Sequence, residues 1–546
     1  MLTSDKFKIH KLIGDPKEAF YQLGLKDKNF LEDILSHLEE VTKSDQKVLD
    51  LMTQKSLDLY ALYASANLAD EIPYLDDYLS GSGTSKNDFF KAMTYPEILT
   101  ALTQFMPLNM VQLACSSIFH LNQNGEMLHL RVLDFPLHDT YAQADRVLLT
   151  EFEDKQKVCS LGPRGMPLHS LTAMNESGLS IAIHQKFDRH FMPSGTPIMM
   201  IAHEIISKAK TLSDAKRISK KYASIGTWGV QMADSEGNVL SIEYSRGKTI
   251  FKEKKLETGE FLYINNQLFD IPFNDAIPAS INMYNHCRDN FFKLVEKKAL
   301  KRKTAFNEVS LLKFTQVESD KLSEVGEEAI KDPELLSFYT PSSVQVACFN
   351  LTNKNVATMK GEPPKHSCNG ILSIEDIFSS AKIKQVECKT KVNQNHIKGL
   401  RHLMQAQYEY DHKNIDRTYH HLQMSSEYLK GHRYHYFANF YFNGISMIHL
   451  KNRKSLSDLY MKFENDKPNL PDYMKEQTTL FQIRIQYLLG LPYDKLYDEL
   501  KHPLLKSVWQ NEENFPKWGL QAFLRKTTQL RIDMNDFIYI HSKCDS

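Results

Sequence analysis

The sequence predicts an α+β protein in which a middle region of β-hairpins and helices lies between two helical segments. Three observations lead to this prediction. Apolar residues recur at helical spacing up to about residue 112, strand–turn–strand patterns begin at Cys115, and helical patterns return after about residue 395. The 546 residues suffice for roughly two to four domains and a large core.

Composition excludes several classes of function. The 67 basic and 67 acidic side chains leave no net charge, which argues against nucleic acid or an anionic membrane as the main partner. The seven cysteines form no CxxC pair, so we expect no structural zinc, no other metal and no cofactor. The N-terminus lacks the apolar core of a signal peptide, and no apolar run is long enough to span a bilayer. These features predict a cytoplasmic protein without a transmembrane segment.

Residues 1–114 are predicted to be helical. Asp15-Pro16 is a helix-start signal, because an N-cap residue precedes a proline in the first turn. From Phe30 to Leu38 the apolar residues follow the spacing of one helix face.

The middle region is predicted to be a largely antiparallel sheet with helices. Asn124-Gly125 is a strong hairpin dipeptide between two strand patterns. Similar patterns occur at 170–185, 227–245 and 344–360. Helices are expected at 198–209 and 213–223, the second with Ser213 as its N-cap.

A boundary is predicted near residues 361–364, which include Gly361 and two prolines. Residues 366–394 are predicted to form a linker. Residues 395–546 are predicted to form an all-α domain of short helices that resembles tetratricopeptide hairpins. Such stacks usually offer a surface for a partner, so this domain is a candidate for protein binding or self-association.

Cys115 is the strongest candidate nucleophile. If Asn124-Gly125 forms the two-residue loop of its hairpin, Cys115 lies opposite Asp134; if the loop is one residue earlier, it lies opposite Val132. In either register Arg131 and Asp134 lie close to the thiol. Buried charges need partners, and a nucleophilic thiol needs groups that adjust its pKa and orient a substrate. The pattern therefore favours a catalytic cysteine over a core cysteine.

These residues resemble the cysteine N-terminal nucleophile (Ntn) hydrolases, in particular the isopenicillin N acyltransferase, acid ceramidase and choloylglycine hydrolase group. In that group an essential Arg and an essential Asp follow the nucleophile at the spacing of Arg131 and Asp134, and the segment Leu133 to Pro136 fits the same motif. The segment Met174 to Leu179, which contains Asn175, resembles the next hairpin of the group. The segment Ala233 to Glu243 resembles the one after it.

Other positions of this sequence match the motifs of the group less closely. The segment YINNQ resembles a strand end of the group, which places Asn266, or its neighbour Asn265, at an oxyanion-stabilising asparagine. Gln185 stands near the place where bile salt hydrolases carry a second oxyanion asparagine, and Arg288 is the candidate for a late arginine. Ala114 and Ser116 depart from the Gly and Thr that often flank the nucleophile.

The resemblance implies a fold and a mechanism. The fold is a four-layer αββα sandwich over residues 115–365, and residues 1–114 become the pro-segment of a zymogen that cleaves itself between Ala114 and Cys115. The new α-amine then acts as general base and Asp134 orients it. Arg131 holds the thiolate or the substrate, and backbone N–H groups together with Asn266 or Gln185 stabilise the oxyanion. The implied substrate is a small linear non-peptide amide, N-acylated or lipid-like, whose acyl group passes through a thioester on Cys115 to water or to an amine.

Two other interpretations stay open at this stage. A papain-like thiol protease would use Cys115 with a distant histidine and would need no cleavage before the cysteine. A catalytically silent Ntn scaffold would act as a binding protein through its C-terminal helices and would keep an intact chain.

Overall fold

The computed structural model describes residues 8–42, 47–102, 114–135, 145–186, 188, 192–269, 289, 292–293, 296–297, 299–300, 305–315, 343–361, 370–386, 394–411, 414–431, 434–449, 452–470, 472–501 and 503–526. The chain forms two compact units. The first comprises Met1–Pro278, Phe292–Gln316 and Ser342–Lys389, and the second contains Thr390–Ser546. Of the predicted site residues, Arg288 lies outside the described residues.

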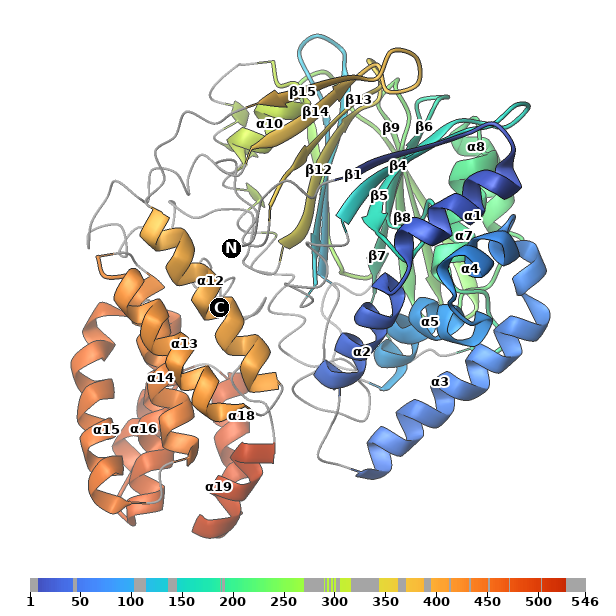
Figure 1. The fold of residues 1–546 in the computed structure, drawn as a ribbon. Coiled ribbons are helices and arrows are strands. Elements are labelled where there is room, and N and C mark those ends of the chain that lie inside the picture. The colour runs from blue at the N-terminus through green and yellow to red at the C-terminus, as the bar shows by residue number, and fades with distance from the viewer. Residues whose placement is uncertain are drawn as a thin grey trace. The chain divides into compact units, whose positions relative to one another are not determined.

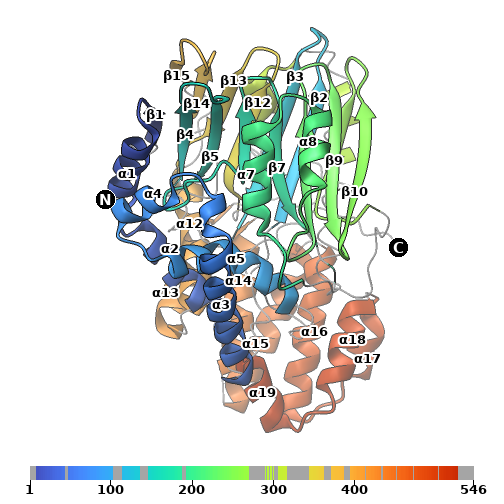
Figure 2. The same cartoon turned by 90° about the vertical axis from the view of Figure 1, so that its right-hand side faces the viewer.

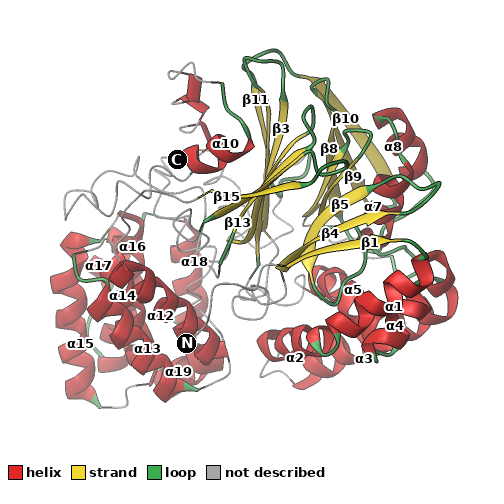
Figure 3. Cartoon of the chain, turned by 45° about the horizontal axis from the view of Figure 1, so that its top comes forward, coloured by secondary structure: helices red, strands yellow, loops and turns green. Residues whose placement is uncertain are grey.

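Two sheets form the centre of the first unit (Figures 1 and 3). Sheet A has the order β1 (Lys8–Ile13), β4 (Asp145–Glu151), β5 (Val158–Pro163), β6 (Thr172–Asn175), β7 (Ser180–Gln185), β8 (Trp228–Ala233), β9 (Asn238–Ser245) and β10 (Lys248–Lys255). Sheet B has the order β11 (Phe261–Ile264), β2 (Ala114–Leu121), β3 (Met127–Asp134), β12 (Ser343–Asn350), β13 (Asn355–Met359), β14 (Ile371–Glu375) and β15 (Lys382–Val386). The predicted hairpins β2–β3, β6–β7, β8–β9 and β12–β13 are all present as antiparallel pairs.

Helices cover the outer faces of the sheets. Helices α7 (Ile198–Lys208) and α8 (Leu212–Ser219) lie on sheet A, where Figure 2 shows them in front of the strands. Helix α10 (Glu308–Phe314) contacts β12 and β13 of sheet B. The described layers therefore follow the predicted order of helix, sheet, sheet and helix. The N-cap of α8 is Thr211, whose hydroxyl accepts the N–H of Asp214, and not Ser213 as the sequence predicted.

The N-terminal segment is built into the same unit. Five of its helices are α1 (Pro16–Asp27), α2 (Phe30–Thr42), α3 (Lys47–Asn67), α4 (Leu75–Ser82) and α5 (Lys86–Leu102). The prediction of helix throughout is wrong for Lys8–Ile13, which forms β1 and pairs in parallel with β4 at the edge of sheet A. Helices α1 and α4 cross at Gly24 and Gly81, where an added Cβ would lie 2.1 Å from a carbonyl oxygen of the other helix. The helices can approach this closely because neither residue has a side chain.

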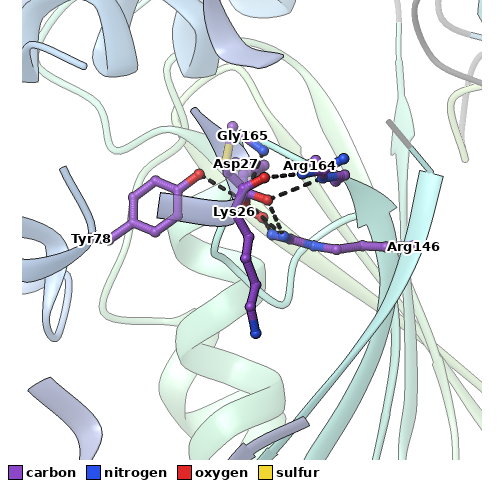
Figure 4. A network of polar contacts seen from close by, with 7 residues as sticks. Lys26, Asp27, Tyr78, Arg146, Arg164 and Gly165 are labelled. Carbon is purple, nitrogen blue, oxygen red and sulfur yellow. Dashed lines mark hydrogen bonds and ion pairs between the residues drawn. The ribbon is translucent and has the colours of Figure 1, made fainter. Parts of the chain in front are cut away.

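A buried ionic network joins α1 to sheet A (Figure 4). The Asp27 carboxylate is fully buried and accepts two hydrogen bonds, of 2.6 and 2.7 Å, from Nη1 of Arg146 on β4. It also accepts the Tyr78 hydroxyl of α4 at 3.0 Å, Nε of Arg164 at 3.3 Å and the N–H of Gly165 at 3.1 Å. One carboxylate thus connects two N-terminal helices to the strand and the loop beside it.

Glu97 makes a second buried connection, between α5 and the helix–sheet layer. Its carboxylate accepts the N–H of Ile198 at the start of α7 at 2.6 Å, the N–H of Gly226 at 2.9 Å and the indole N–H of Trp228 at 3.1 Å. Burial raises the pKa of this carboxyl from 4.5 to about 7, although the three donors oppose the rise.

We expect Glu97 to make stability depend on pH. Between pH 4.5 and about 7 the folded protein keeps a proton that the unfolded chain has released, so its contribution is present below pH 4.5 and falls as pH rises through 7. Relative to Glu97→Gln, the wild-type free energy of unfolding should decrease by about 3 kcal/mol between pH 4 and pH 8. Urea denaturation of both proteins across this range measures the difference. A difference that stays constant with pH would contradict the expectation.

The end of the first unit differs from the prediction. Residues 371–375 and 382–386, which were predicted to lie in a linker, form β14 and β15 and extend sheet B beyond β13. Four residues of β14, Ile371 to Ile374, are buried, whereas β15 is an edge strand whose lysines stay exposed. The polar composition of this edge explains why the segment resembled a linker.

The described residues of the second unit from 394 onward form helices and no strand, as predicted. Its helices are α12 (Gln394–Asp411), α13 (Ile415–Tyr428), α14 (Tyr434–His449), α15 (Arg453–Asp466), α16 (Asp472–Leu489), α17 (Asp494–Glu499), α18 (Pro503–Glu512) and α19 (Lys517–Lys526). Phe440, Phe463 and Phe481 pack together in its core, and a buried ion pair joins Arg484 to Glu512 at 2.6 Å. The tetratricopeptide-like repeat stays a prediction. No helix among the described residues is both long and apolar enough to cross a membrane.

Candidate active site

The β2–β3 hairpin decides which side chains face Cys115. Its loop is five residues long, from 122 to 126, because the Asn122 side chain accepts the N–H groups of Asn124 and Glu126. Cys115 therefore lies opposite Leu133, and both predicted registers are wrong. Since paired residues point to the same face of a sheet, Cys115, Ser117, Arg131 and Leu133 share the face toward sheet A.

The Cys115 thiol is held by Arg131. Nη2 of Arg131 lies 2.8 Å from Sγ and also donates to the carbonyl oxygen of Ile183 at 2.8 Å, while Nη1 donates to that of Val132 at 2.8 Å. Both side chains are buried. Burial raises the pKa of the thiol, and the Arg131 guanidinium and the backbone N–H of Gln185 oppose that rise. Arg131 is thus placed to stabilise a thiolate.

The backbone nitrogen of Cys115 has its own partner. Its N–H donates to Oδ1 of Asn266 at 2.8 Å, and Nδ2 of Asn266 donates to the carbonyl oxygen of Gln185 at 2.6 Å. The orientation of the amide is fixed, because one neighbour can only donate and the other can only accept. Asn266, predicted to stabilise an oxyanion, presents its oxygen to the atom that cleavage would convert into an α-amine.

Asp134 lies on the opposite face of β3. Its residue pairs with Ala114 across β2 and with Ser343 across β12, and its Oδ1 accepts the Ser343 hydroxyl. The carboxylate is fully buried. Asp134 is therefore next to the predicted scission site between Ala114 and Cys115, and its negative charge acts to raise the pKa of the Cys115 thiol.

The other predicted residues divide into two groups. Asn265 is close to the site, because its carbonyl oxygen accepts Nζ of Lys186 at 2.8 Å and lies 3.3 Å from Nδ1 of His184. The side chain of Gln185 instead donates to the carbonyl oxygen of Pro96 in α5 at 3.3 Å, so the backbone of Gln185 is what faces Cys115. Asn175 binds the carbonyl oxygens of Ile206 and Ala209 at the end of α7, which is a structural role rather than the predicted substrate contact.

Sequence reasoning missed a buried polar cluster between the sheets, consisting of Ser117, His129, Ser180, His184 and Lys186. Ser117 bonds His184 at 2.9 Å and His129 at 3.0 Å, and His129 bonds Ser180 at 2.8 Å. Farther toward the hairpin loop the same space is filled by Phe119, Met127 and other apolar side chains. Alternate residues of a strand point to the same face, so the polar residues at every second position of β2, β3 and β7 could have predicted this cluster.

A papain-like pair is not formed by the residues at the thiol. The hydrogen-bond partners of Sγ in the described chain are Arg131 and the backbone of Gln185. His184, the histidine that contacts Arg131, bonds Ser117 and the Asn265 carbonyl oxygen. Burial and the charge of Arg131 lower the pKa of His184 well below its usual value.

Within the described residues no group of three or more His, Cys, Asp or Glu side chains could hold a metal ion.

A sequence model of the acyl-coenzyme A:6-aminopenicillanic acid acyl-transferase family matches residues 123–318. The match confirms the resemblance to the acyltransferase group of the Ntn hydrolases. It spans Arg131, Asp134 and Asn266 and begins eight residues after Cys115. It covers less than half of the chain. None of the curated protein sequences matches this chain significantly.

Three similar solved structures are amidases or related hydrolases. One is the ortholog of N-acylethanolamine-hydrolyzing acid amidase from Caenorhabditis elegans, with 13% identity and a TM-score of 0.31 over 44% of this chain and 93% of that one. Penicillin V acylase from Agrobacterium tumefaciens has 12% identity and a TM-score of 0.32 over 50% and 91% of the two chains. A mutant of the conjugated bile acid hydrolase from Clostridium perfringens has 12% identity and a TM-score of 0.31 over 51% and 98%.

Proposed function

We propose that this protein is an autoprocessed cysteine Ntn hydrolase that cleaves a non-peptide carbon–nitrogen amide bond, or transfers the acyl group to an amine, through a thioester on Cys115. The family match supports an enzyme that acts on amides or transfers acyl groups. Processing, the nucleophile and the roles of the site residues are parts of this proposal.

One observation carries the proposal. Both reactive groups of a future N-terminal cysteine have partners in the intact chain: Sγ is 2.8 Å from Arg131, and the backbone nitrogen is 2.8 Å from Oδ1 of Asn266. A core cysteine needs neither contact. An Ntn nucleophile needs both, because its amine must be oriented to accept the proton that its thiol releases.

The chemistry follows in two stages. In processing, the Cys115 thiol attacks the carbonyl carbon of Ala114 and displaces its own backbone nitrogen, and water then hydrolyses the resulting ester of the thiol. The freed α-amine, with an unperturbed pKa of about 7.7–8.0, takes the proton of the Cys115 thiol, and the resulting thiolate attacks a substrate carbonyl. It returns the proton to the departing amine, which leaves the acyl group on sulfur for water or another acceptor.

The contacts around the site suggest roles in that sequence. Arg131 stabilises the thiolate, and Oδ1 of Asn266 accepts a hydrogen bond from the new amine. Asp134, beside Ala114, contributes to the geometry of the scissile peptide bond. The backbone N–H of Gln185, which faces Sγ, is the donor that a tetrahedral oxyanion can use.

The N-terminal segment is proposed to stay bound after cleavage. Strand β1 lies within sheet A, and the buried carboxylates of Asp27 and Glu97 are hydrogen-bonded to residues that follow Cys115. A segment released as a separate pro-peptide would leave Arg146 buried without this counter-charge. Partner binding or self-association through residues 395–546 is a separate part of the proposal. The proposed location of the protein is the cytoplasm.

Intact mass of the purified protein tests the function. Wild-type protein should give two chains, residues 1–114 and 115–546, and should hydrolyse N-acyl amides, whereas Cys115→Ala should stay a single inactive chain. Cys159→Ala is the matched control, because Cys159 is also a buried free thiol but lies on β5; it should be cleaved normally. Wild-type protein that stays at full length yet hydrolyses amides would disprove the terminal-amine mechanism. A single chain without amidase activity would favour the silent scaffold.

A further inference from the structure

A continuous line of hydrogen bonds crosses the space between the two sheets next to the nucleophile. It runs from the Ser180 hydroxyl of β7 to His129 of β3 at 2.8 Å, on to Ser117 of β2 at 3.0 Å, and back to His184 of β7 at 2.9 Å. It ends at the carbonyl oxygen of Asn265, 3.3 Å from Nδ1 of His184. All four side chains are fully buried.

The carbonyl at one end determines the direction of every bond. Since the Asn265 oxygen can only accept, Nδ1 of His184 carries the proton and Nε2 of His184 accepts the Ser117 hydroxyl. Ser117 then accepts from Nε2 of His129, and Nδ1 of His129 accepts the Ser180 hydroxyl. Each neutral imidazole thus uses one nitrogen as donor and the other as acceptor, so no member of the line lacks its partner.

Both imidazoles fit this neutral state. Burial, together with the charge of Arg131, lowers the pKa of His129 to about 3 and that of His184 well below its usual value. The charged groups around them are Arg131, with Nη1 3.4 Å from Nε2 of His184, and Lys186, whose Nζ binds the same Asn265 oxygen at 2.8 Å. A second imidazolium charge beside these cations would be unfavourable.

The line reaches both groups that hold Cys115. Asn265 immediately precedes Asn266, which accepts the N–H of Cys115. His184 follows Ile183, whose carbonyl oxygen accepts the same Arg131 nitrogen that contacts Sγ. Since the Asn265 carbonyl cannot give up a proton, the line cannot reverse its direction to carry protons. Its remaining role is to hold the neighbouring residues in position.

We propose that Ser117, His129, Ser180 and His184 are positioning residues that hold Arg131 and the Asn265–Asn266 strand end against Cys115. This inference deepens the proposed function and rests on it, because it assigns the orientation of the nucleophile to a hydrogen-bonded line rather than to apolar packing. Breaking the line in its middle should loosen Arg131 and make the thiolate less stable.

Ser117→Ala removes the central hydroxyl, and Ser117→Thr restores one. Ser160→Ala is the matched control: the Ser160 hydroxyl is 2.7 Å from His169, which in turn is 3.0 Å from Thr150, so the substitution also breaks a buried Ser–His contact. The measurement is the rate at which iodoacetamide alkylates Cys115 as a function of pH, read by mass spectrometry of the Cys115 peptide. This readout needs neither an amide substrate nor cleavage of the chain.

In Ser117→Ala the midpoint of the alkylation curve should rise by about one pH unit. At a pH below both midpoints, the variant would then have about one tenth of the wild-type thiolate fraction. Ser117→Thr and Ser160→Ala should keep the wild-type curve. The inference would be overturned if wild type and Ser117→Ala gave the same alkylation curve, or if neither reacted. It would also be overturned if Ser160→Ala shifted the curve as much as Ser117→Ala. If Ser117→Ala does not fold, Ser180→Ala carries the same test: a rise supports the inference and an unchanged curve overturns it.

The two proposals can fail separately. A wild-type chain that neither cleaves itself nor hydrolyses amides would refute the proposed function while the alkylation curves still report on the line. Normal processing and amidase activity with unchanged curves in the variants would refute only the positioning role.

Discussion

Arg131→Ala is expected to lower the turnover of amide substrates by about 100-fold or more, the scale of a lost positioned catalytic group. Nη2 of Arg131 is 2.8 Å from Sγ of Cys115, and among the described residues Arg131 is the cation whose charge lowers the pKa of the thiol. Without the guanidinium, burial and the nearby Asp134 carboxylate both raise the pKa of the thiol, and the N–H of Gln185 remains to oppose the rise. Steady-state kinetics with the most active N-acyl amide measure the loss, with Cys115→Ala as the floor.

Two further variants make this result specific. Arg217→Ala removes an exposed arginine that pairs with Asp214 on α8 and should leave turnover unchanged. Asp134→Ala should cost about as much as Arg131→Ala, since Asp134 pairs with Ala114 at the proposed site of cleavage. Because Arg131 is fully buried, thermal melting must first show that the variant is folded. Near-normal turnover in folded Arg131→Ala protein would remove Arg131 from the active site.

Asp27→Ala is expected to lower the free energy of unfolding by about 3–5 kcal/mol, the usual cost of removing one partner of a buried ion pair. The substitution leaves Arg146 buried without its carboxylate and removes the acceptor of Tyr78, Arg164 and Gly165. Urea or guanidinium denaturation measures the change. In processed protein, gel filtration should also show the N-terminal chain separating from the rest.

Asp76→Ala is the control for this substitution. Asp76 forms an ion pair with Lys86 at 2.8 Å, and its side chain is 72% exposed. Exposed pairs of this kind contribute about 0–1 kcal/mol, so Asp76→Ala should hardly change stability. A loss for Asp27→Ala no larger than that for Asp76→Ala would mean that the network in Figure 4 does not anchor the N-terminal helices.

Sequence spacing was enough to find the candidate nucleophile and its arginine, because both lie on one hairpin. Two strands joined by a short loop must pair, so residues at matching distances from the loop become neighbours whatever surrounds them. The hairpins at 170–185, 227–245 and 344–360 were predictable for the same local reason. The all-α character of residues 395–526 was predictable from helical spacing alone.

The face on which each residue lies was not predictable. The two registers inferred from the loop dipeptide placed Asp134 or Val132 opposite Cys115, whereas the observed pairing places Leu133 opposite Cys115 and Arg131 on the same face. The difference arises from the Asn122 side chain, which closes a five-residue loop. A shift of one residue exchanges the two faces of a strand, so the two hydrogen bonds accepted by one side chain help to decide which charged group meets the thiol.

The sequence by itself determined four hairpins, among them the one that carries Cys115 and Arg131, and the resemblance to the Ntn hydrolases. Only the tertiary structure decided that β1 joins sheet A, that β14 and β15 extend sheet B, that the Gln185 side chain points to Pro96, and that Ser117, His129, Ser180 and His184 form one line. The first set depends on periodicity and turn chemistry within short segments. The second set depends on which distant segments pack together, where burial forces each polar group to find a partner that local sequence does not name.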